Sequence, residues 1–143
     1  GNDIAIIAAG IMVWKALEAA EELAKRQGIQ ARVINNHTIK PLDYETTIAA
    51  ARDCGAIVTA EEHQVHGGLG GAIAEAVVKN HPVPMEFVGI KDTFGASGEP
   101  DELTEIFGLT WQSIYASAIK AIERKNNPSN EIREVKDIPE FKD

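Results

Sequence analysis

The chain has 143 residues, enough for one domain that buries about two-thirds of the surface exposed by its unfolded form. The 14 Lys and Arg residues against 22 Asp and Glu give a formal net charge of −8, so a phosphate backbone would be repelled and nucleic acid is disfavoured as a partner. No apolar run is long enough for a membrane span, and the single cysteine, Cys54, cannot form an internal disulfide, so we expect a cytoplasmic protein with no membrane partner.

Short apolar runs alternate with segments of helical periodicity along the chain. We expect four strands, at Ile4–Ala8, Ala31–Asn35, 56–60 and Met85–Ile90. The first helix is expected to bury Val13, Ala16, Leu17, Ala20, Leu23 and Ala24. This alternation predicts a three-layer α/β/α fold around a parallel sheet. We expect the strand order 2-1-3-4, because the first and third strands are near-continuous apolar runs whereas the second carries Arg32.

The ends of the predicted helices have recognisable signals. Gly28 is expected to end the first helix, whereas Asp43 and Thr110 are expected to cap the second and the last. A short helix is also predicted at 101–107. Residues 1–125 are therefore expected to form the α/β domain, and residues 126–143, which are charged and lack a clear period, a polar C-terminal tail.

The most distinctive segment directly follows the third predicted strand. It contains Glu61, Glu62, His63, His66, Gly67, Gly68 and Gly70. We interpret it as a polar loop and glycine turn at the carboxyl ends of the strands, where ligands and partner chains usually dock. Its glycines let the backbone turn sharply and let another surface approach closely. Carboxylates beside imidazoles could bind zinc or share acid–base chemistry. A polar interface loop is the favoured alternative, since no other His or Cys in the chain has ligand spacing.

Three further positions are candidates for function. Gly10 begins a helix whose free N–H groups could hold an anion, although neither neighbour has a hydroxyl and the G-x-G-x-x-G pattern is absent. The predicted loop 91–98, with Asp92 and Phe94, could clasp a ligand or form a subunit contact. Cys54 has only Arg52 as a basic neighbour in sequence, so we interpret it as an inert buried thiol.

Four motifs in this order resemble the carboxyl-terminal domain of transketolases, particularly of the short or split kind. They are DIAIIAAG at 3–10, IKPLD at 39–43, EEHQVHGGLG at 61–70 and KDTFGASGEPDEL at 91–103. The resemblance extends from Asp3 to about Lys125. Similar domains end deoxyxylulose-phosphate synthases and the β-chains of 2-oxo-acid dehydrogenases, but the segment 91–103 favours transketolase.

The resemblance implies a role in assembly without catalysis by this chain. Transketolases transfer a two-carbon ketol unit between sugar phosphates with thiamine diphosphate and Mg²⁺, which two other domains hold. The Gly-Asp-Gly metal motif of those domains is missing from this chain, and no catalytic residue of the family maps onto it. The implied partners are the remaining transketolase domains or an N-terminal subunit, in a homodimer of the complete enzyme.

The sequence departs from the family in two places. Ala9 and Ile11 replace the hydroxyl residues that family members often carry around Gly10, which weakens an anion site there. An antiparallel edge strand that usually precedes the family's first parallel strand is missing, so we expect a piece of a longer protein with Ala31–Asn35 as an open edge. The alternative from another class is a free-standing flavodoxin-like module that binds a small anion at Gly10 and Gly67–Gly70.

Overall fold

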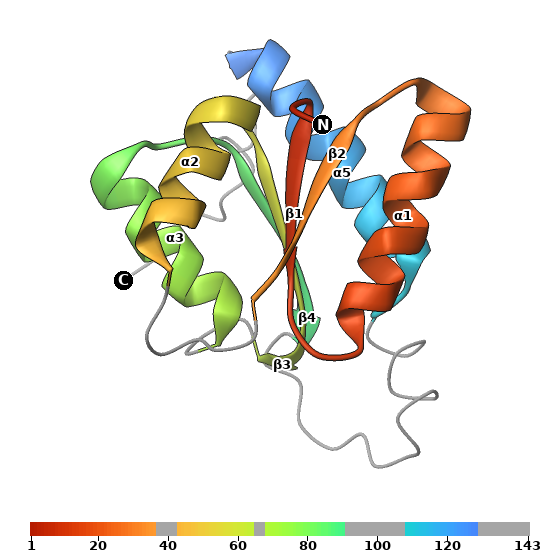
Figure 1. The fold of residues 1–143 in the computed structure, drawn as a ribbon, viewed down its shortest axis with the longest axis horizontal. Coiled ribbons are helices and arrows are strands. Elements are labelled where there is room, and N and C mark those ends of the chain that lie inside the picture. The colour runs from red at the N-terminus through yellow and green to blue at the C-terminus, as the bar shows by residue number, and fades with distance from the viewer. Residues whose placement is uncertain (37–42, 65–67, 91–107, 129–143) are drawn as a thin grey trace, which may run out of the picture.

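A computed structural model describes residues 1–36, 43–64, 68–90 and 108–128. Its centre is a parallel sheet of four strands in the order β2-β1-β3-β4 (Figure 1). The strands are β1 (Ile4–Ala8), β2 (Ala31–Asn35), β3 (Ile57–Gln64) and β4 (Met85–Ile90). The predicted strand order is therefore confirmed, with β1 and β3 central and β2 at an edge of the sheet.

Two helices cover each face of the sheet, which confirms the three predicted layers. α1 (Met12–Gln27) and α5 (Trp111–Asn126) lie side by side on one face (Figure 1). α2 (Tyr44–Cys54) and α3 (Leu69–Asn80) pack together on the other. No helix in these described ranges is long and apolar enough to cross a bilayer.

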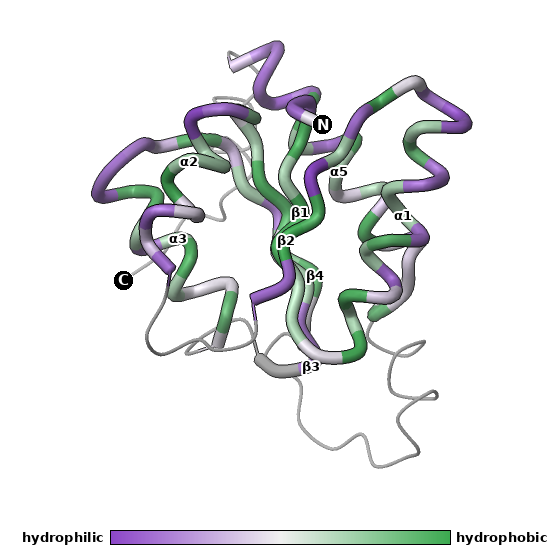
Figure 2. Tube along the Cα trace, in the orientation of Figure 1, coloured by the Kyte–Doolittle hydropathy of each residue, from purple (hydrophilic) through white to green (hydrophobic). Residues whose placement is uncertain are grey.

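Every residue of β1 is buried because helices cover both of its faces. Alternate side chains enter the two halves of the core, Ile4 and Ile6 beneath α1 and α5, and Ala5 and Ile7 beneath α2 and α3. Ile6 also lies between Val33 of β2 and Val58 of β3 in the ladder. Figure 2 shows the hydrophobic residues concentrated along these inner strands, as the apolar runs predicted.

The helix ends predicted from the sequence are confirmed within the described residues. Gly28 ends α1 in the left-handed conformation, at φ 68°. Asp43 accepts a bond from the Thr46 N–H at the start of α2, and Thr110 accepts one from the Ser113 N–H at the start of α5. The helix expected at 101–107 and most of the expected tail lie outside the described residues.

The predicted inner face of α1 is partly wrong. The buried residues of this helix are Met12, Ala16, Ala19 and Leu23. Leu17, which we expected inside, is 46 % exposed. Small alanines occur on several sides of the helix, so the sequence leaves its rotation about its own axis ambiguous. Packing against the sheet and α5 decides it by burying Ala16 and Ala19 together with Ile114 and Ala118.

The C-terminal end of α5 is fastened to the amino ends of the strands. Lys125 Nζ donates to the carbonyl oxygens of Asp3 and Cys54, at 2.8 and 2.9 Å. One residue earlier, Arg124 donates to the Met85 carbonyl and to the Glu86 carboxylate of β4. These bonds connect the last described helix to β1, α2 and β4, and so close one side of the domain.

Candidate functional site

The acidic residues after Ala60 belong to a strand and not to a loop. β3 continues to Gln64, so Glu61, Glu62 and His63 are strand residues, contrary to our prediction. The ladder between β3 and β4 is irregular between Ala60 and Gln64, where the strand leaves regular pairing. This irregular end lies at the carboxyl edge of the sheet, at the bottom of Figure 1.

Glu61 caps the helix that follows it. Its carboxylate accepts bonds from the backbone N–H groups of Leu69 and Gly70, at 2.8 and 2.6 Å, and its side chain is only 1 % exposed. The N-cap residue of α3 is Gly68, which has no side chain to perform this role. The helix N-terminus also carries a partial positive charge that stabilises a buried carboxylate. Glu61 therefore joins β3 to α3 and is not a free acid or base.

Gly70 is required for close packing and not for a turn. A Cβ on this residue would lie 2.9 Å from Phe87 Cδ1, 3.0 Å from Thr59 Oγ1 and 3.1 Å from Glu61 Oε2. Neither Gly68, at φ −103°, nor Gly70 has a positive φ angle, so the sharp turn expected at these glycines is wrong. The close approach that we also expected is confirmed at Gly70. The bare backbone at Gly70 lets α3 approach the sheet closely enough for the Glu61 bonds to form.

The neighbouring carboxylate, Glu62, lies against the turn between β1 and α1. The nearest atoms to the Cβ position of Gly10 are Glu62 Oε1 at 3.9 Å and its Cδ. Gly10 itself has φ 64°, a conformation that glycine adopts freely. The N-cap residue Ile11 has no capping side chain. An anion bound at this turn would meet the negative charge of Glu62, which argues against the anion site considered from the sequence.

Glu62 Oε1 is buried, and it accepts no hydrogen bond from any residue that the structure describes. Burying such an oxygen without a hydrogen-bond donor costs free energy.

Four other candidate residues, His66, Gly67, Asp92 and Phe94, fall outside the described residues. Within the described ranges, no group of three His, Cys, Asp or Glu side chains could hold a metal ion. We therefore derive no chemical step through a metal or thiamine diphosphate in this chain.

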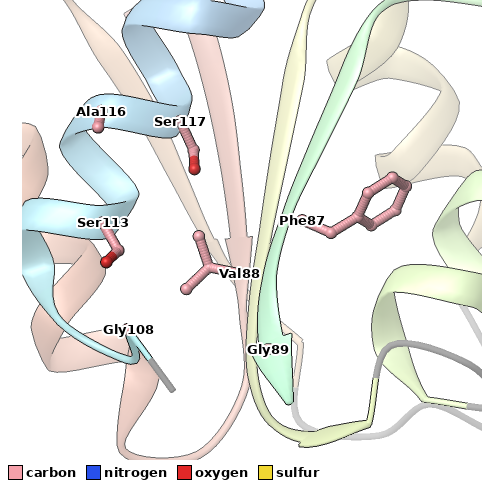
Figure 3. A pocket seen from close by; sticks show the side chains of 7 residues that line it. All are labelled: Phe87, Val88, Gly89, Gly108, Ser113, Ala116 and Ser117. Carbon is pink, nitrogen blue, oxygen red and sulfur yellow. The ribbon is translucent and has the colours of Figure 1, made fainter. Parts of the chain in front are cut away.

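A cavity of about 290 Å³ lies between β4 and the start of α5. It is lined by Phe87, Val88, Gly89, Gly108, Ser113, Ala116 and Ser117. In Figure 3 the hydroxyl of Ser117 points toward Val88, whereas Phe87 points to the other side of β4. The Ser113 hydroxyl accepts a bond from Thr110 Oγ1 at 3.2 Å. Among the residues that the structure describes, the lining is formed by apolar, glycine and serine residues.

Cys54 is an inert thiol, as expected. It is buried at the end of α2, and this burial raises its pKa above the ordinary value for a cysteine. A thiol held in its neutral form is a poor nucleophile. The described part of the carboxyl edge contains the helix-capping carboxylate of Glu61, the close-packed Gly70, and Glu62 beside the Gly10 turn.

The strand order 2-1-3-4, with helices on both faces and Glu61 at the end of β3 capping α3, defines a three-layer α/β/α domain. The family model "Transketolase, C-terminal domain" matches residues 1–114. The chain therefore belongs to the transketolase C-terminal domain family, as its motifs indicated.

Three relatives illustrate the range of similar proteins. A 6-deoxy-6-sulfo-D-fructose transketolase subunit of Clostridium sp. (strain MSTE9) is 52 % identical over 126 residues, covering 88 % of this chain and 39 % of the relative. A 1-deoxy-D-xylulose-5-phosphate synthase of Geobacter sulfurreducens is 40 % identical, covering 95 % of this chain and 22 % of the relative. A solved split-gene transketolase, described as an inactive beta4 tetramer, is 47 % identical with a TM-score of 0.82, covering 87 % of this chain and 41 % of the solved one. The chain thus spans less than half the length of each.

Sequence reasoning missed the role of Glu61. The usual N-cap signal is a Ser, Thr, Asp or Asn immediately before the helix, whereas this carboxylate comes eight residues before Leu69. The available signal was Gly68 at the N-cap, because the first N–H groups of a helix that starts without a capping side chain need an acceptor from elsewhere. Glu61 therefore has a structural role, as the acceptor for the first N–H groups of α3.

Proposed function

We propose that this chain is the C-terminal domain of a split-type transketolase and that it supports assembly of an enzyme whose chemistry lies elsewhere. The complete enzyme would transfer a two-carbon ketol unit between sugar phosphates, with thiamine diphosphate and Mg²⁺ held by the other domains. Membership of the transketolase C-terminal family supports this role, as does similarity to transketolase subunits of which the chain spans only part.

The observation that carries this proposal is the engagement of Glu61. The carboxylate at the centre of the most distinctive motif is buried and accepts two backbone N–H bonds, so it holds α3 to the sheet and is not presented to a substrate. The other described members, Glu62 and Gly70, lie against backbone or side chains of the same domain. We propose that the segment 61–70, with Asp92 and Phe94, contributes to contacts with the rest of the enzyme.

Co-expression tests the dependence of the enzyme on this chain. The polypeptide that carries the other transketolase domains is produced with and without residues 1–143, and ketol transfer and assembly state are measured. We expect assembled, active enzyme only when the chain is present. Full ketol transfer by an enzyme lacking all 143 residues would contradict the assembly role.

A single substitution separates assembly from chemistry. His63→Ala should leave turnover per assembled dimer nearly unchanged, because we assign no proton transfer to this segment. Sedimentation gives the fraction of assembled enzyme, and a steady-state assay gives turnover of that fraction. A drop of several orders of magnitude in an intact dimer would mean that the segment 61–70 is catalytic.

A further inference from the structure

The first half of α1 exposes three large apolar side chains in one stripe. Ile11, Trp14 and Leu17 follow at three-residue spacing and are 45, 72 and 46 % exposed. The second half of the helix is mainly hydrophilic (Figure 2) and carries two exposed ion pairs, Glu21–Lys25 and Glu22–Arg26. Only the first half therefore resembles a surface that another protein covers.

The apolar stripe (Ile11, Trp14 and Leu17) adjoins the carboxylate that has no described donor. Gly10 directly precedes Ile11, and its Cβ position lies 3.9 Å from Glu62 Oε1. That oxygen is buried and accepts no hydrogen bond within the described ranges. Glu62 as a whole is only partly buried, so a cation from a covering protein could pair with its carboxylate while the partner's apolar surface covers Trp14.

We propose that the apolar stripe and Glu62 form the surface on which the rest of the transketolase packs. The partner surface would present an apolar hollow for Trp14 and a lysine or arginine for Glu62. This inference rests on the proposed function and adds the place and the chemistry of the contact.

Two observations favour the rest of the enzyme over a second copy of this chain. The chain covers only 39 % of the length of the transketolase subunit it resembles, so most of such an enzyme lies outside it and must contact it somewhere. The net charge of −8 also disfavours two copies meeting face to face, whereas a basic partner complements it.

Trp14 provides a direct probe of this contact. The chain has two tryptophans, and the other, Trp111, is replaced in a Trp111→Phe background so that the emission comes from Trp14 alone. The 143-residue chain is titrated with the polypeptide carrying the other domains, in a tryptophan-free form of that polypeptide. We expect the Trp14 emission to shift to the blue and to become protected from acrylamide quenching as the complex forms.

Matched variants measure the contribution of each group. Trp14→Glu should raise the Kd of the complex about 30-fold or more, the effect expected of an interface hot spot. Val78→Glu is the control, because Val78 is 68 % exposed but lies on α3, on the other face of the sheet. It should change the Kd less than about twofold, as a position outside the interface would. Glu62→Gln should weaken binding about tenfold and reduce its salt dependence, because it removes a charge pair.

Three results would overturn the inference. In the first, ketol transfer needs the chain, but Trp14→Glu binds as tightly as the wild type; the surface is then wrong while the proposed function stands. In the second, the 143-residue chain alone forms a homodimer that Trp14→Glu dissociates, which would make the apolar stripe a contact between two copies. In the third, Glu62→Gln lowers the Tm of the isolated chain and leaves the Kd unchanged, so the donor to Glu62 lies within this chain. Ketol transfer that never needs the chain would instead remove the proposed function itself.

Discussion

Glu61 buries a negative charge where the backbone supplies N–H donors. The first N–H groups of α3 have no partner inside the helix, and two of them, from Leu69 and Gly70, donate to this carboxylate. The positive end of the helix stabilises the same charge. A residue that would ordinarily be solvated thus becomes part of the core between β3 and α3.

Removing this cap should destabilise the domain strongly. Glu61→Ala leaves two N–H groups without their acceptor, so we expect the free energy of unfolding to fall by about 3 kcal/mol. Urea unfolding followed by circular dichroism measures the change. Glu18→Ala, on the exposed side of α1, is the control and should cost less than about 0.5 kcal/mol. A loss below about 1 kcal/mol for Glu61→Ala would show that other acceptors, such as water, replace the carboxylate.

Gly70 gives a second prediction at the same junction. The Cβ of Gly70→Ala would come within 2.9 Å of Phe87 Cδ1, so we expect a clash. Such overpacking typically costs about 2 kcal/mol in the free energy of unfolding. Phe87→Leu removes the ring that the new Cβ would contact. The double variant should therefore lose less free energy of unfolding than the sum of the losses in the two single variants. Additive losses in urea unfolding would place the strain at Thr59 or in the backbone instead.

At the scale of whole elements, β3 and α1 show where sequence patterns mislead. Glu61 and Glu62 have low strand propensity, yet they extend β3 because their carboxylates lie against α3 and the Gly10 turn. In α1 the expected rotation placed Leu17 inside, but burying Ala16 and Ala19 lets α5 pack closely. Contacts between residues far apart in the sequence set both the length of β3 and the rotation of α1, so neither could be predicted from a local stretch of sequence.

The C-terminal end of α5 gives an element-scale prediction. Lys125 donates to the carbonyls of Asp3 and Cys54, which belong to two other parts of the fold. Lys125→Met keeps the aliphatic stem but removes both charged bonds, so we expect a loss of about 2 kcal/mol. Lys120→Met is a matched change on the same helix, where the ammonium is 3.6 Å from Glu86, and it should cost less than about 0.5 kcal/mol. Equal shifts of Tm for the two variants would contradict a fastening role for Lys125.

At the scale of the whole molecule, most of the fold could be predicted. Alternating apolar runs and helical repeats determined the strand order, because parallel strands require crossovers and buried strands are continuously apolar. The candidate segment 61–70 was expected at the carboxyl edge of the sheet, where its described residues lie, and the interface role favoured for it stays a prediction. Its residues are typical of ligands and acids, and only three-dimensional contacts reveal that Glu61 serves the backbone of α3.

The cofactor of the complete enzyme provides the whole-molecule prediction. We expect thiamine diphosphate with Mg²⁺ to leave the Tm of the 143-residue chain unchanged, because we assign both to other domains. A ligand at one hundred times its Kd would stabilise the folded chain by about 2.7 kcal/mol, which a thermal scan detects readily. A clear rise in Tm with both ligands, absent with Mg²⁺ alone, would place a cofactor site in this chain.

The pairing of α1 with α5 affects how the protein folds while it is being synthesised. These helices complete one layer together, although α1 follows the first strand and α5 is the last described element. During translation, the apolar side of β1 beneath α5 therefore stays uncovered after the opposite layer has been made. At about 5–20 residues per second, the stretch from the end of α3 to the end of α5 takes about 2 to 9 seconds. The nascent chain should be most prone to chaperone binding in that interval, and release of α5 from the ribosome should end it.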